Sequence, residues 1–256
     1  MRFRALILAS SLSLIPCVAS AEVPNLEALI KKGGQVILEY SDKAANPYTD
    51  RTFIVQMRLE GGNDDGRKLK MKMISKHGTR TAIRFQEPSD LKGLALVIKG
   101  ASEIYVKLPG TRKVRRVASH ARKQGFQGTD WSMDDLRLLH LAPSFDATIK
   151  EVTNTHVILN LIKKPKADLP YSRIIAHLPK AHLVPERMEY FDEEGTKIKV
   201  QQRSNMRKNK AGRMSYVSNK MTDLIRNHST YLEVLEESHE RVPDRTFSKR
   251  WLVRGS

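Results

Sequence analysis

Cysteine is almost absent from this sequence: the chain of 256 residues contains a single one, Cys17. One thiol forms neither an internal disulfide nor a cysteine-based zinc site. Aromatic residues are also scarce, at 6%, which leaves few rings on which the bases of a nucleic acid would stack. Hydrophobic residues nevertheless make up 40% of the chain. We therefore expect a protein that folds by burying an apolar core, without cross-links.

The familiar signatures of catalysis are missing as well. The sequence contains no G-x-S-x-G, P-loop or G-x-G-x-x-G motif, and its eight histidines follow no metal-binding spacing. Two groups of neighbouring acids remain, Asp134-Asp135 near the start of an expected helix and residues 192–194 in an expected turn. Adjacent acids on a helix point in different directions, and acids in turns are usually solvated. We predict no enzyme activity, no metal and no cofactor.

Long hydrophobic runs are limited to the N-terminus. There, an apolar stretch over residues 5–18 follows Arg2 and Arg4 and precedes the small residues Ala19-Ser20-Ala21. This order is typical of a secretory signal peptide, and the run is too short to span a bilayer comfortably. We predict a cleaved signal peptide over residues 1–21, with a buried N-terminal helix as the alternative.

Cleavage between Ala21 and Glu22 leaves residues 22–256 as one exported domain. It also removes Cys17, the one residue that a bacterial lipoprotein would acylate. Pro16 stands before it where a lipoprotein signal needs a small residue. Lipid anchoring at Cys17 is therefore not expected.

Beyond residue 50, apolar and polar residues alternate over many short segments that are separated by glycine and proline. This period of two indicates antiparallel strands with one buried and one wet face. A short helix is expected between Pro24 and Gly33, followed by an apolar segment over residues 36–40. A second helix is expected over residues 133–141, and a terminal one capped by Asp244. The expected strands contain residues 53–59, 69–73, 83–85, 94–98, 104–108, 148–152, 156–161, 174–178, 187–191 and 197–201, with 214–217 and 231–235 as further candidates.

Positive charge dominates the composition, with 45 Lys and Arg against 28 Asp and Glu and a net charge of +17, or +15 without the two signal-peptide arginines. Residues 163–166 form one dense group. The other, which we call the basic cluster, consists of Arg112, Lys113, Arg115, Arg116, Arg122 and Lys123. Export makes nucleic acid an unlikely partner for it, so phospholipid headgroups, acidic polysaccharide or an acidic protein face are favoured. A generally basic surface without a specific use is the alternative.

Four segments occur in an order that resembles a known family. They read IRFQEPSDLKG at 83–93, IYVKLP at 104–109, RKVRRV at 112–117 and GFQGTDWSMDDL at 125–136. Shorter pieces up to residue 252 fit the same pattern. Together they resemble the exported LolA-like family of outer-membrane lipoprotein-sorting proteins.

The resemblance implies a mainly β (α+β) fold: a strongly curved antiparallel sheet that forms a half-open barrel, with helices and loops plugging its concave apolar face. It also implies a periplasmic carrier that holds lipid or lipoprotein acyl chains in a hydrophobic cavity. Such a carrier would work with an inner-membrane RND-type transporter and touch the membrane surface transiently. The alternatives are an envelope accessory or scaffold protein that docks on a transporter through its basic surface, and a hydrolase of an acidic envelope polymer.

Methionine and other apolar residues on the expected strands are the candidates for the cavity wall. Methionine adapts to varied apolar shapes, which suits flexible acyl chains, although such residues are more often ordinary core. The candidate lining residues are Phe53, Val55, Met57, Leu69, Met71, Met73, Ile83, Phe85, Leu94, Leu96, Ile98, Met188, Tyr190 and Met214. The basic cluster is the candidate for headgroup or partner docking.

Overall fold

Thirteen strands form one sheet in the computed structural model, which describes residues 25–100, 103–208 and 214–254. The predicted signal peptide, with Ala21 and Glu22, lies outside the described residues. The strands are β1 (Asp50–Glu60), β2 (Lys68–Lys76), β3 (Arg80–Glu87), β4 (Ala95–Lys99), β5 (Glu103–Lys107), β6 (Val114–Arg116), β7 (Phe145–Val152), β8 (His156–Lys163), β9 (Arg173–Pro179), β10 (Arg187–Phe191), β11 (Lys197–Lys208), β12 (Met214–Asp223) and β13 (His228–Ser238).

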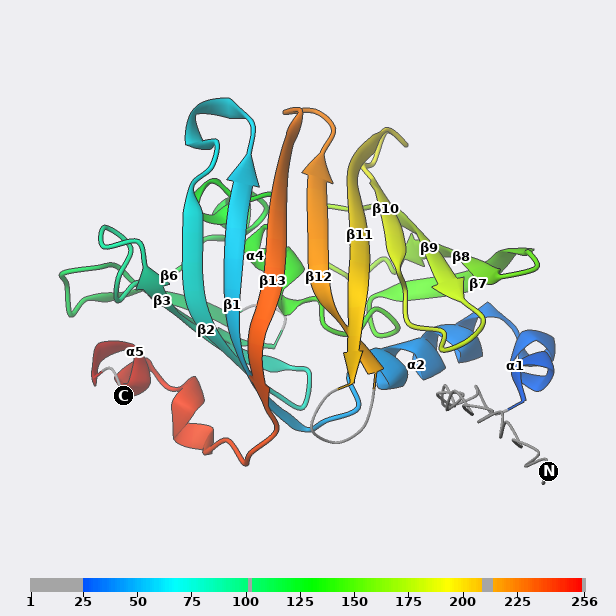
Figure 1. The fold of residues 1–256 in the computed structure, drawn as a ribbon, viewed down its shortest axis with the longest axis horizontal. Helices are drawn as coiled ribbons and strands as arrows, with labels where there is room; N and C mark the ends of the chain where they lie inside the picture. Colours follow the sequence, from blue (N-terminus) through cyan, green and yellow to red (C-terminus); the bar gives the residue numbers. More distant parts are fainter. Residues whose placement is uncertain (1–24, 101–102, 209–213, 255–256) are drawn as a thin grey trace, which may run out of the picture.

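The sheet is antiparallel throughout and remains open. Its strand order is β6-β5-β4-β3-β2-β1-β13-β12-β11-β10-β9-β8-β7, so that β6 and β7 form the two edges and the first and last strands pair at the centre (Figure 1). Along β1, buried Val55, Met57 and Leu59 alternate with less buried neighbours such as exposed Arg58. The open, curved antiparallel sheet predicted from the alternating pattern and the family resemblance is confirmed.

The helices are short and lie against the sheet. They are α1 (Leu26–Lys32), α2 (Gly34–Ala45), α3 (Ser119–Arg122), α4 (Met133–Arg137) and α5 (Lys249–Arg254), together with the 3-10 turns Gly62–Asp64, Phe126–Gly128 and Asp244–Phe247. The apolar segment 36–40 lies within α2. None of the helices in the described ranges has both the length and the hydrophobicity needed to cross a membrane.

The segment that connects the two sheet edges covers the concave face. We call it the plug; it comprises residues 117–144 and includes α3 and α4. Figure 1 shows α4 behind the central strands. The plug buries Trp131 and Leu136 in the main core and places the ring of Phe126 5.6 Å from that of Phe85 on β3. Helix α4 ends at Arg137, four residues before the predicted end.

A second, smaller core lies on the opposite, convex face of β2 to β4. The C-terminal segment buries Phe247 and Leu252 there against Ala82 and Val97. The sequence predicts that Asp244 caps a terminal helix, but Asp244 does not do so. It opens a 3-10 turn, and its carboxylate pairs with Lys76 at 3.0 Å and Arg80 at 3.1 Å, while α5 begins only at Lys249. The prediction was wrong because two cations on the sheet engage the carboxylate.

Candidate functional site

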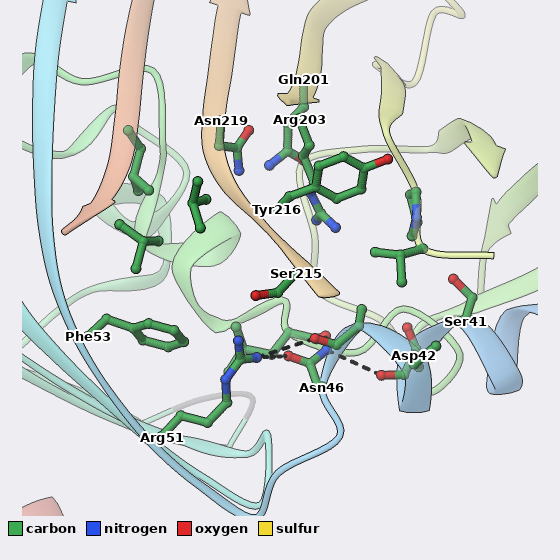
Figure 2. Close-up of a pocket in the computed structure, with 18 of the residues that line it drawn as sticks. Ser41, Asp42, Asn46, Arg51, Phe53, Gln201, Arg203, Ser215, Tyr216 and Asn219 are labelled. Carbon is green, nitrogen blue, oxygen red and sulfur yellow. Dashed lines mark hydrogen bonds between the residues drawn. The ribbon is translucent and has the colours of Figure 1, made fainter. Parts of the chain in front are cut away.

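A pocket of about 270 Å³ opens on the concave side of the sheet, between β1, β2 and β10 to β13 on one side and α2 and the end of the plug on the other (Figure 2). Most of its wall is apolar. The apolar side chains that line it are Ala44, Ala45, Pro47, Phe53, Val55, Met73, Leu138, Leu139, Leu141, Val184, Pro185, Met188, Met214, Val217, Leu232 and Val234.

The helix that forms one wall is held close to the sheet. Gly34, the first residue of α2, lies so near β7 that a Cβ atom there would approach the backbone carbon of Thr148 to 2.7 Å. The Gln35 side chain accepts a hydrogen bond from the Ala147 N–H at 3.0 Å. A larger residue at position 34 would push the start of α2 away from β7, so glycine is needed for this close approach.

Polar contacts join α2 to the end of the plug. The two carboxylate oxygens of Asp42 accept hydrogen bonds from the backbone N–H groups of Leu141 at 3.0 Å and Ala142 at 2.8 Å. Burial raises the pKa of this carboxyl, although the two N–H groups oppose the rise. The Asn46 amide donates to the Leu139 carbonyl at 2.6 Å. These bonds fix the wall of the pocket that faces the sheet.

Arg51, at the start of β1, crosses from the sheet to this wall. Its guanidinium donates to Asn46 Oδ1 at 3.0 Å and to the Ala45 carbonyl at 3.3 Å, and it pairs with Glu237 at 3.1 Å. Burial lowers the pKa of this guanidinium, and Glu237 counteracts the effect. Figure 2 shows Arg51 and Asn46 facing each other at one end of the pocket.

The other end of the pocket is also polar. Gln201 and Arg203 on β11 and Tyr216 and Asn219 on β12 project into it (Figure 2). The Tyr190 hydroxyl donates to Gln201 Oε1 at 2.7 Å. Burial raises the pKa of Tyr216 to about 12, so its phenol stays protonated at neutral pH. An apolar pocket with a few convergent polar groups is the usual form of a small-molecule site.

His182 supports Tyr216 from behind this end. Its Nδ1 accepts a hydrogen bond from the Val184 N–H at 3.1 Å, and its ring meets that of Tyr216 edge to face at 5.7 Å. Burial lowers the pKa of this imidazole, which keeps it neutral and able to accept the bond. Val184, held in this way, lines the pocket.

The family-like segment 125–136 anchors the plug. The buried carboxylate of Asp130 accepts hydrogen bonds from His228 Nδ1, Thr230 Oγ1 and the Arg226 guanidinium, each at 2.7 Å. Lys199 donates to the Asp130 carbonyl at 2.9 Å. These contacts tie the plug to β11 and β13, so the acids of this segment have a structural role.

The start of α4 is equally well fixed. Ser132 caps the helix and forms a reciprocal capping box with Asp135. Asp135 also accepts a hydrogen bond from the Tyr171 hydroxyl at 2.6 Å and pairs with Lys199 at 3.3 Å. Within the described residues, no group of three or more His, Cys, Asp or Glu is placed to hold a metal ion.

The basic cluster is divided by the fold. Arg112, Lys113, Arg115 and Arg116 are exposed on the edge strand β6 and the turn before it; we call these four the basic edge. Arg122 is buried and pairs with Asp168 at 2.5 Å, and it lies 3.9 Å from Asp134. It is therefore a structural residue that is not available for surface docking. Lys123 is half-exposed and lies 3.6 Å from Asp168.

The fourteen candidate lining residues fall into two groups. Six of them line the pocket: Phe53, Val55, Met73, Met188, Tyr190 and Met214. The remaining eight belong to the main packed core, away from the pocket: Met57, Leu69, Met71, Ile83, Phe85, Leu94, Leu96 and Ile98. Strand alternation identifies the concave face but not the part of it that the plug covers, so it does not separate the two groups.

The polar residues of the pocket were missed by the sequence reasoning. Arg203 follows Lys199 and Gln201 on the same face of β11, so this face carries no apolar alternation, and the predicted strand stopped at residue 201. Arg51 and Asp42 precede the first clearly alternating segment. The signal that could have revealed Arg203 was the polar pattern Lys-x-Gln-x-Arg over residues 199–203. This pattern lies within a strand that continues beyond residue 201.

Three solved structures share this fold. A domain assigned to the outer membrane lipoprotein-sorting proteins, from Vibrio parahaemolyticus, is 21% identical with a TM-score of 0.76, and the match covers 90% of this chain and 100% of that one. A DUF1329 family protein from Desulfovibrio piger is 20% identical with a TM-score of 0.79, over 88% and 99% of the two chains. A LolA superfamily protein from Nitrosomonas europaea is 18% identical with a TM-score of 0.73, over 86% and 99%.

These identities are low, so the three structures establish the fold and leave the ligand open. No curated protein matches the sequence. A family model described as "Uncharacterized protein" matches residues 77–254, which include the plug, the basic edge and seven of the strands that follow the plug. The chain therefore belongs to this family of uncharacterized proteins, and its fold is that of the LolA-like lipoprotein-sorting proteins.

Proposed function

We propose that the protein is a carrier, without enzyme activity, that binds the acyl chain of a lipid or lipoprotein in the concave pocket. The observation that carries this proposal is the pocket itself: apolar side chains from five strands, α2 and the plug surround an opening that the core does not fill. The likeness to a lipoprotein-sorting protein domain supports it. Each methylene moved from water into such a wall contributes about 0.8 kcal/mol.

The volume of the pocket limits what it holds in this conformation. At about 270 Å³ it lies just below the range of roughly 300–1,000 Å³ typical of small-molecule sites. It therefore suits one short or medium acyl chain. A longer chain requires α2 and the 138–141 turn to move away from the sheet, and such a movement would also allow cargo to leave.

Filling the pocket tests the proposal. In Val234→Trp, an indole occupies the space next to Leu232 and Phe53, so we expect the affinity for a fluorescent acyl probe to fall at least tenfold. Ile162→Trp is the matched control, because Ile162 is 47% exposed on β8 and away from the pocket. Solvent extraction and mass spectrometry of the purified protein should also find a bound lipid, at lower occupancy in Val234→Trp. A protein that carries no lipid and binds no probe would contradict the carrier function.

The setting of this carrier follows from the predicted signal peptide and the family resemblance. We place it in the periplasm, where it exchanges lipid or lipoprotein with the membranes and receives or delivers cargo at an RND-type transporter. Nucleic acid has no part in this function.

A second candidate function, docking on a transporter as an accessory protein, is favoured by the basic edge. Four exposed cations gather on β6 and the turn before it, and the outer side of this edge strand has no partner strand in the described chain. Such a strip of positive charge fits an acidic protein face.

Charge reversal separates docking from cargo binding. The triple variant Arg112→Glu, Arg115→Glu and Arg116→Glu should lose co-sedimentation with inner-membrane vesicles that contain their proteins, while its acyl-probe affinity stays within twofold of the original. Liposomes of the same lipids without protein distinguish a protein partner from the lipid surface. Reversal of Lys68, Lys92 and Lys166, all exposed, gives the same change in net charge elsewhere. If the first variant loses probe binding and still co-sediments, docking through the basic edge is refuted.

A further inference from the structure

Arg203 occupies an unusual position in the pocket. It lies on the inward face of β11 in line with Lys199 and Gln201, and its cross-strand partner on β12 is Asn219. Figure 2 shows the Arg203 side chain beside Tyr216, with Gln201 and Asn219 next to it. Four polar side chains from two neighbouring strands thus meet at one end of an otherwise apolar pocket.

The other cations on this face are paired. Arg51 is matched by Glu237 and by acceptors at the end of α2, and Lys199 by Asp135 and the Asp130 carbonyl. Arg203 differs, because its guanidinium makes no side-chain hydrogen bond or ion pair within the described ranges, and the charge that favours it in the wall is the Asp42 carboxylate. A partly buried guanidinium whose N–H groups have no acceptor is costly, which makes it a candidate for contact with a ligand.

Its neighbours also have unused hydrogen-bonding capacity. Asn219 Oδ1 is buried and has no partner among the described residues. Gln201 accepts from Tyr190 through Oε1, which leaves its amide N–H groups facing the pocket. The Tyr216 hydroxyl, in contrast, is already shared with His182 Nε2 at 3.4 Å. The Gln201 amide N–H groups and the Arg203 guanidinium supply donors of the kind that a carboxylate or phosphate group requires.

The other charged groups of the pocket already have partners. Asp42 is the one carboxylate in the wall, and both of its oxygens are engaged by backbone N–H groups. Arg51 is neutralised by Glu237, so Arg203 is the charged group of the lining that no hydrogen bond or ion pair from the described residues engages. A purely apolar cargo would leave its guanidinium N–H groups without an acceptor.

We propose that the Arg203 end of the pocket binds the anionic group of an acidic single-chain amphiphile, a carboxylate or a phosphate, while the acyl chain lies against the apolar wall. The planar guanidinium fork suits bidentate contact with either group. This inference rests on the proposed acyl-chain carrier function and narrows it to acidic cargo.

The test compares ligands that share one chain and differ in charge. Calorimetric titration of the intact protein with laurate, lauryl phosphate and methyl laurate should show the two anions binding at least tenfold more tightly than the ester. Arg203→Met keeps an apolar stem and removes the charge. In this variant the anions should fall to the affinity of the ester, while the ester itself is unaffected. Arg203→Lys should retain part of the preference.

Arg207→Met is the matched control. Arg207 lies on the same strand, its side chain is 59% exposed and it is outside the pocket, so the preference for anions should persist. Inorganic phosphate and acetate test for a site that takes free anions. Should either displace laurate at equal concentration, the inference of an amphiphile is overturned.

The remaining outcomes separate the two proposals. Equal affinity of acid and ester for the unmodified protein overturns this inference and leaves the carrier function standing. Failure of all three chain ligands to bind contradicts the carrier function itself. If Arg203→Met does not fold, the comparison of acid and ester on the unmodified protein still decides the question.

Discussion

Asp130 shows how a single buried charge can organise a distant part of the chain. Its carboxylate is completely buried, and three donors from the end of the sequence surround it: Arg226, His228 and Thr230. The sequence pattern drew attention to segment 125–136, and the three donors lie in segment 226–230. Their contact could not be predicted, because they lie about a hundred positions apart and one sequence carries no signal of pairing between them.

The Asp130 network should dominate the anchoring of the plug. In Asp130→Ala, three donors lose their common acceptor inside the protein, so we expect the free energy of unfolding to fall by about 3 kcal/mol. Urea denaturation at neutral pH measures this loss. Asp146→Ala is the control, because the Asp146 side chain is 70% exposed and its pairing with Lys164 spans 3.7 Å; it should change stability by less than about 0.5 kcal/mol. Equal effects of the two variants would contradict the role given to Asp130.

The pocket residues illustrate a different limit at the same scale. Val55 and Met188 could be predicted because both lie on strands that alternate clearly. Arg203 could not, since strand β11 carries polar residues on its inward face at 199, 201 and 203. The unusual feature there is a strand whose inward face is polar. Only its register with β12, in which Arg203 pairs with Asn219, shows that these polar residues meet in the pocket.

At the scale of elements, the two faces of the sheet have separate tasks. The concave face holds the plug, the main core and the pocket. The convex face of β2 to β4 is covered by the C-terminal segment, which buries Phe247 and Leu252. Because the two cores lie on opposite sides of the sheet, stability and cargo binding should respond independently to changes in each.

Phe247 is the largest side chain of the convex core and is 2% exposed. Phe247→Ala should reduce the free energy of unfolding by about 3 kcal/mol, through lost burial and the cavity that remains. At temperatures where the variant is folded, its affinity for an acyl probe should stay within twofold of the original. Val253→Ala, at a 36% exposed position on the neighbouring helix α5, should be close to neutral. A Phe247 variant that is folded but no longer binds the probe would show that the faces are coupled.

Element boundaries followed local chemistry more closely than the pattern suggested. Helix α4 starts where Ser132 and Asp135 form a capping box, and the conformation of Leu138, with a ψ of 63°, ends it before the predicted residue 141. The prediction that Asp244 caps a helix was wrong because its carboxylate forms ion pairs with Lys76 and Arg80, which are distant in the sequence. Existence and type of most strands were predictable from the alternation, whereas helix α2, the short strand β6 and such long-range ionic contacts were not.

At the scale of the whole molecule, the open antiparallel sheet was predictable from alternation and from the order of the family-like segments. The strand order adds what the sequence could not provide. Each strand from β1 to β6 pairs with the next one along the chain, and so does each strand from β7 to β13. β6 and β7 do not pair, because the plug carries the chain from one edge of the sheet to the other. The pocket lies over strands from both halves, so no local pattern could define its wall.

The pairing of the first strand with the last has a consequence for the order of events during synthesis. Met57 pairs with Leu232, which leaves the ribosome 175 positions later. Until then, β1 to β6 and β7 to β12 can form only as two separate meanders. The pairing of β1 with β13, which forms the floor of the pocket, is still missing. Closing a contact across so much chain is slow. The binding site is therefore among the last features of the chain to form.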